Sequence, residues 1–150
     1  MRRCTLAAAA AATLALGAPV LAMEHKTIID HPVGTIAADY SGKSRVSLQQ
    51  VGSVSVGGRP ETLRCRWTVS LVVERQARLG SGQEARRTLA QSDVVKGSAP
   101  GWCPQRDQAA ERLAAKHRDD LHAALMALVE QDRALILAEA DRMRGTPREG

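Results

Sequence analysis

Residues 62–74 read Thr-Leu-Arg-Cys-Arg-Trp-Thr-Val-Ser-Leu-Val-Val-Glu, and the alternation in this stretch decides the fold. Every second residue is apolar, and most of the residues between them are polar or charged. A period of two with one apolar face is typical of a β-strand that is half-buried against a core. The inward set is Leu63, Cys65, Trp67, Val69, Leu71 and Val73.

Shorter runs on either side predict further strands at 27–29, 33–40, 45–56 and 85–95. Tyr40-Ser41-Gly42-Lys43 predicts a turn, because serine and glycine cluster there between two apolar runs. The inward parity of the 45–56 run is interrupted near Gly52, which predicts a bulge. The 85–95 run predicts a weaker strand at the edge of the sheet, with an ambiguous inward face.

The C-terminal part of the chain predicts one long helix over about 104–144. Pro104 suits a first helical position, and no further glycine or proline occurs before Gly145. Strands followed by a helix predict an α+β fold. We expect an antiparallel β-meander of about four strands (about 27–96) with the helix packed on one face. It forms a single domain over 23–145, and 146–150 are expected to be a disordered tail.

The length of the predicted helix raises a packing question. About 40 helical residues span about 60 Å, whereas a globule of this size is about 35 Å across. Either the helix bends or breaks, most plausibly within 130–133, or its far half projects. A projecting half would leave apolar side chains for a second copy to cover, which predicts a homodimer. Those side chains are Leu128, Leu135, Ile136 and Met143.

The first 22 residues have the order of a secretory signal peptide. Arg2 and Arg3 precede an apolar run from Cys4 to Ala18, and Pro19 is followed by Val20-Leu21-Ala22. We therefore expect cleavage after Ala22 and a mature protein that is periplasmic or secreted. The alternative is an uncleaved membrane anchor, although alanine is weakly apolar for a span. The mature form is not expected to span a membrane, and the choice between the general and twin-arginine routes stays open.

Two cysteines remain after this cleavage, Cys65 and Cys103. An even number of cysteines in an oxidising compartment predicts a disulfide between them. A metal pair or a catalytic thiol would need a third partner at a suggestive spacing, and the sequence offers none.

Composition narrows the classes of partner. The full chain has a formal net charge of +5, and residues 1–22 contain two arginines and no acidic residue, so the mature chain carries +3. The aromatic residues are Tyr40, Trp67 and Trp102 alone. Because stacking platforms are scarce, nucleic acid is not an expected partner.

No motif predicts a catalytic, metal or cofactor site. Gly42-Lys43-Ser44 lacks the first glycine of a phosphate-binding loop and leads into a strand. His117 and His122 are five residues apart, whereas two helical metal ligands need a spacing of three or four to share a face. The carboxylates of the helix alternate with arginines in an ordinary pattern of charge pairing.

One cluster suggests a binding surface. Arg64 and Arg66 lie on the solvent side of the central strand, and Arg86 and Arg87 lie on its expected neighbour. Arginines on one sheet face suit an anionic partner, such as an envelope lipid or an acidic protein. The alternative is an exposed face on which they pair with Glu61, Glu74 and Glu84.

These observations predict a small exported interaction module that is not an enzyme. It would act through the sheet face, the 97–102 loop or the helix. Two alternatives stay open, which are a small cell-envelope hydrolase without a sequence signature and a helix-mediated structural dimer. A pocket that gathers a histidine, a carboxylate and a serine would favour the hydrolase.

Overall fold

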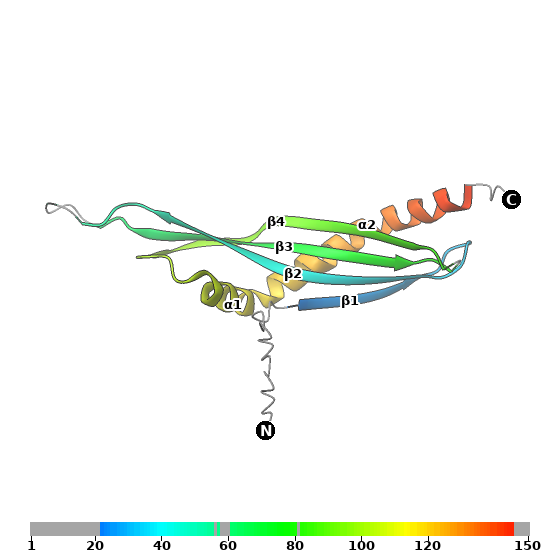
Figure 1. The fold of residues 1–150 in the computed structure, drawn as a ribbon, viewed down its shortest axis with the longest axis horizontal. Coiled ribbons are helices and arrows are strands. Elements are labelled where there is room, and N and C mark those ends of the chain that lie inside the picture. The colour runs from blue at the N-terminus through cyan, green and yellow to red at the C-terminus, as the bar shows by residue number, and fades with distance from the viewer. Residues whose placement is uncertain (1–21, 56, 58–60, 81, 146–150) are drawn as a thin grey trace, which may run out of the picture.

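The structure, a computed structural model, describes residues 22–55, 57, 61–80 and 82–145. One antiparallel sheet has the strand order β1-β2-β3-β4, and two helices follow it (Figure 1). This confirms the expected α+β meander. The elements are β1 (Ala22–Ile29), β2 (Ile36–Val51), β3 (Arg64–Arg78), β4 (Glu84–Pro100), α1 (Arg106–Lys116) and α2 (Arg118–Gly145).

The expected signal peptide falls almost wholly on residues outside the described part, as does the expected tail at 146–150. Ala22, at the expected cleavage site, is the first residue of β1. Within the described residues, no helix is long and apolar enough to cross a membrane.

The core lies between one face of the sheet and α2. The alternation of β3 continues as expected, and its inward side chains Val69, Leu71 and Val73 are fully buried. Leu121, Leu125 and other apolar side chains of α2 belong to the same cluster. Since a buried side chain of this size contributes about 1.5–3 kcal/mol, this layer supplies most of the stabilising burial.

The expected turn at residues 40–43 is wrong, because Tyr40 and Gly42 lie inside the continuous strand β2. The backbone of Gly42 does not have a positive φ. Side-chain atoms of Leu71 and Leu125 lie within 4 Å of the position where a Cβ would stand on Gly42. The glycine is therefore a packing residue beneath α2.

The helical region is interrupted at His117 instead of within 130–133. His117 has φ −108° and ψ 30°, outside the helical range, and its ring nitrogen Nδ1 lies 3.0 Å from Asp120 Oδ2. The His117 ring also packs against Trp67, with ring centroids 5.4 Å apart. Asp132, which the sequence marks as a polar break, is instead buried against the sheet.

The sheet is long enough to cover α2. Strands β2, β3 and β4 have 16, 15 and 17 residues, which corresponds to about 50–55 Å. Helix α2 has 28 residues, about 42 Å, and runs diagonally across the sheet (Figure 1). The assumption of a compact globule was therefore wrong, and Leu128 and Ile136 are buried within the chain. Met143 packs partly against the core, whereas Leu135 is 40% exposed.

A disulfide joins Cys65 on β3 to Cys103, in the segment between β4 and α1. The side chain of Gln50 reinforces this connection from β2. Its amide nitrogen donates to the carbonyl oxygens of Arg64 (2.9 Å) and Gly101 (3.2 Å), and its amide oxygen accepts from the backbone N–H of Cys103 at 2.7 Å. The three segments that meet at this end of the sheet are thus held together.

Removing the disulfide should destabilise the fold. The cysteines are 38 residues apart, and in the chain-entropy model closing such a loop stabilises the folded state by about 4 kcal/mol. We expect Cys65→Ser with Cys103→Ser to lower the free energy of unfolding by about this amount, measured by denaturant titration. An unchanged free energy, or two free thiols in protein purified without a reductant, would contradict the prediction.

Candidate functional site

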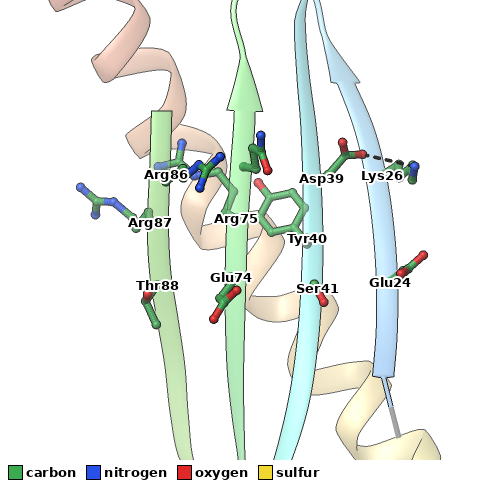
Figure 2. A pocket seen from close by; sticks show the side chains of 11 residues that line it. Glu24, Lys26, Asp39, Tyr40, Ser41, Glu74, Arg75, Arg86, Arg87 and Thr88 are labelled. Carbon is green, nitrogen blue, oxygen red and sulfur yellow. Dashed lines mark ion pairs between the residues drawn. The ribbon is translucent and has the colours of Figure 1, made fainter. Parts of the chain in front are cut away.

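The candidate site is the face of the sheet opposite α2. Alternate residues of each strand point away from the helix, and they are mostly exposed and polar. Figure 2 shows α2 on the far side of the sheet from Glu24, Ser41 and Glu74. We call this surface the open face. It has two parts that differ in charge.

The first part is a shallow groove of about 440 Å³ near the β3–β4 turn. Two rows of side chains cross the four strands there. Strand register places Glu24, Ser41, Glu74 and Thr88 in one row, and Lys26, Asp39, Gln76 and Arg86 in the next (Figure 2).

The charges in this groove largely pair with one another. Lys26 lies 3.8 Å from Asp39, and Arg86 lies 3.7 Å from Glu84 beside the groove. Arg78 also pairs with Glu84, at 3.5 Å. No histidine is among the described residues that line the groove, so it lacks the expected base for a serine hydrolase.

The second part of the open face is basic and extends along the sheet from the disulfide towards the groove. It comprises exposed side chains on β2, β3 and β4, and we call it the basic patch: Lys43, Arg45, Arg64, Arg66 and Lys96. Strand register places Arg66 between Gln49 and Ser98, and Lys96 opposite Thr68. Lys43 is opposite Val72, eight residues from Arg64 along β3, so the patch is about 26 Å long.

The cations of the basic patch form no ion pair with the described residues, although Asp93 lies nearby on β4, with its backbone N–H donating to Ser70 Oγ opposite Arg45. Among the residues that the structure describes, no carboxylate lies within 4 Å of any of the five. Arg64 donates to the hydroxyl of Ser98 at 3.0 Å. Hydroxyl and amide groups lie between the cations, among them Ser47, Gln49 and Thr68. The surface can therefore offer both positive charge and hydrogen-bonding groups to an anion.

The structure separates the four arginines that the sequence grouped together. Arg64 and Arg66 are on the open face as expected. Arg86 is also on that face, but it is opposite Gln76, ten residues from Arg66 along β3, or about 33 Å. Arg87 is on the helix-covered side, where its guanidinium pairs with Glu139 at 3.2 Å. The arginines therefore form no single surface.

A buried ionic network lies beneath the groove, and the sequence analysis missed it. Arg75 is an inward residue of β3 and is 2% exposed. Its guanidinium donates to both carboxylate oxygens of Glu139 on α2, to Oε2 at 2.9 Å and to Oε1 at 3.2 Å. Its Nε lies 3.4 Å from Asp132 Oδ2. The Tyr40 hydroxyl donates to that same Asp132 oxygen at 3.0 Å.

A sequence signal for this network does exist. The alternation of β3, continued past Val73, makes Arg75 an inward residue. Asp132 and Glu139 are seven residues apart, so they share one face of a helix. An inward arginine and two carboxylates on one helix face are complementary, but nothing local shows that they meet.

Burial and charge alter the acidity of two groups in the network. Burial, together with the charge and hydrogen bond of Asp132, raises the pKa of Tyr40 above its usual range, so Tyr40 remains a neutral donor. Burial alone would raise the pKa of Glu139. The hydrogen bonds and charge of Arg75, helped by Arg87 and Arg142, outweigh burial and hold that pKa below 4.5. The network positions α2 on β3, although Arg75 Nε and Asp132 Oδ1 are buried without a hydrogen-bond partner among the described residues.

No family model matches the chain, no curated protein matches its sequence, and no solved structure matches its fold.

The lowered pKa of Glu139 predicts a pH-dependent contribution to stability. Above the unfolded-state pKa of about 4.5 the ionised group stabilises the fold, and this contribution is lost as the pH falls through the lower folded-state pKa. Glu139→Gln should therefore lower the free energy of unfolding by about 1–3 kcal/mol at neutral pH. The gap between wild type and variant should narrow below pH 4.5.

Urea titrations across the acid range measure this gap. Glu130→Gln is the matched control, since Glu130 is an exposed residue of the same helix and should show no such gap. A Glu139→Gln gap that stays constant or widens in acid would contradict the lowered pKa.

Proposed function

We propose that this protein is an exported, non-enzymatic binding module that takes an anionic partner on the basic patch. The N-terminal sequence supports export to the periplasm or the medium, with cleavage after Ala22. The disulfide is compatible with such an oxidising compartment. The observation that carries the proposal is that no cation of the basic patch lies within 4 Å of a carboxylate of the described residues.

The contrast within the open face supports this interpretation. Near the β3–β4 turn, Lys26, Arg78 and Arg86 each lie within 4 Å of a carboxylate. At the disulfide end, cations on three adjacent strands have no such neighbour in the described part of the chain. Five like charges on a flat surface repel one another, so an anionic partner would relieve the repulsion as well as add attraction.

The rigidity of this end favours binding. The disulfide and Gln50 hold β2, β3 and the segment before α1 together. A surface that is already ordered loses little conformational entropy on binding. By contrast, the hydrolase alternative would need a base in the groove, and no described histidine lines it.

A polyanion without lipid or protein tests the proposal. Labelled inorganic polyphosphate should bind the protein, and the affinity should fall steeply with salt. The double variant Arg64→Gln/Arg66→Gln should weaken binding more than tenfold, since each substitution removes a direct charge contact with the polyanion. Fluorescence anisotropy measures both effects.

The control double variant is Lys26→Gln/Arg86→Gln. It removes the same net charge from the other end of the open face, about 30 Å away, and should change the affinity little. Equal weakening by the two double variants would show an effect of net charge alone and would contradict a site at the basic patch. Failure of the wild-type protein to bind would also contradict it.

Self-association through α2 is a separate proposal, and its support has narrowed to Leu135. Of the four side chains expected at a dimer interface, Leu128 and Ile136 are buried within the chain, Met143 is partly buried, and Leu135 is 40% exposed. Met126, exposed on the same helix, adds some apolar surface.

Two substitutions separate core from interface on this helix. Leu135→Glu should change monomer stability by less than about 0.5 kcal/mol, because surface substitutions usually do. Ile136→Glu should destabilise the fold by several kcal/mol, because it buries a charge. Sedimentation across a concentration series then tests the dimer. A dimer that Leu135→Glu abolishes supports self-association, and a monomer at every concentration contradicts it.

A further inference from the structure

The end of the molecule that carries the basic patch also carries an exposed tryptophan. Trp102 is 70% exposed in the loop between β4 and α1. The preceding residue, Gly101, donates its backbone N–H to the Leu63 carbonyl at 2.9 Å, which brings the loop beside Arg64. Val54, near the end of the β2–β3 hairpin, is also exposed. Figure 1 shows this hairpin and the loop at the same end of the sheet.

The two tryptophans of the chain have different environments. Trp67 packs against Gly97, where an added Cβ would clash with the indole, and against the His117 ring. Trp102 has no such packing, although its neighbour Cys103 is held by the disulfide and by Gln50. A rigid loop therefore presents a large aromatic side chain to solvent.

This combination fits the surface of a lipid bilayer. Tryptophan is favoured at the level of lipid headgroups, because its ring is largely apolar while the indole N–H can still donate a hydrogen bond to water there. Lysine and arginine close to the same boundary are attracted to anionic headgroups. An array of cations about 26 Å long suits an array of phosphates better than one small ligand.

We propose that the anionic partner is a phospholipid bilayer, with Trp102 at the headgroup level and the basic patch facing the phosphates. This inference rests on the proposed function, and it names the partner of the same surface. The protein would bind peripherally, with the open face towards the lipid. The groove lies on the same face beyond Lys43, and its cations already pair with carboxylates there, so they would add little attraction to the lipid.

Vesicle binding by the exported protein tests the inference. Vesicles of equal parts phosphatidylglycerol and phosphatidylcholine should bind it, and vesicles of phosphatidylcholine alone should not. Binding should shift the tryptophan emission to shorter wavelength, because Trp102 leaves water while Trp67 keeps its surroundings. Arg64→Gln/Arg66→Gln should weaken binding about 25-fold, at about fivefold for each charge.

Matched variants separate specific from general effects. Trp102→Ala should weaken binding and remove the emission shift, whereas Ile28→Ala should change neither. Ile28 is the control because it is equally exposed but lies at the opposite end of β1 from the basic patch. Lys26→Gln/Arg86→Gln controls for net charge.

Each outcome bears on one proposal or on both. Binding to polyphosphate without binding to anionic vesicles overturns the lipid inference and leaves the proposed function standing. Failure to bind either probe overturns both. Three other results overturn the lipid inference alone. The first two are equal binding to the two vesicle types and vesicle binding that Trp102→Ala leaves unchanged. The third is competition by soluble glycerol phosphate at the vesicle's own phosphate concentration. Binding to polyglutamate but not to vesicles points to an acidic protein instead.

Discussion

The packing of α2 against one face of the sheet is the contact on which the rest of the structure depends. The chain has almost no aromatic residues, so its core is built from leucine, isoleucine, valine and alanine. Such side chains stabilise the fold through the amount of apolar surface they bury rather than through directional contacts. Leu121 and Leu125 on the helix and Leu71 and Val73 on β3 form the centre of this layer. Because only one face of the sheet is covered, the period of two along each strand leaves the other face polar.

Apolar packing alone does not determine where α2 lies along the sheet, and the ionic network adds that information. Arg75 can pair with Asp132 and Glu139 together only when the helix stands at one axial position. A buried ion pair contributes little net stability, because desolvation offsets much of its attraction, but removing one partner leaves a buried charge and is costly. The network therefore disfavours shifted positions of the helix more than it stabilises the observed one. One oxygen of Asp132, Oδ1, has no hydrogen-bond partner among the described residues, which adds to the desolvation cost of the network.

The cations on the two faces of the sheet differ in whether they pair with carboxylates, and this difference is the basis for the proposed function. Arg75 and Arg87, on the covered face, are matched by carboxylates of α2. The basic patch, on the open face, has no such match in the described part of the chain. The proposal that these cations bind a partner rests on this difference and on the exposed tryptophan near them.

Local patterns in the sequence determined the central strand, the α+β order of elements and the cysteine pair. The alternation from Leu63 to Val73 and the absence of glycine and proline across most of the C-terminal region are properties of neighbouring residues, so they can be interpreted without the fold. Tertiary structure decided the rest. Gly42 is a packing residue because Leu125, more than 80 residues away, lies above it. Asp132 sits inside a helix because Arg75 and Tyr40 meet it there. Adjacent Arg86 and Arg87 must point to opposite faces, and only the pairing of β4 with β3 determined which of them faces α2, because strand register is a contact between distant segments.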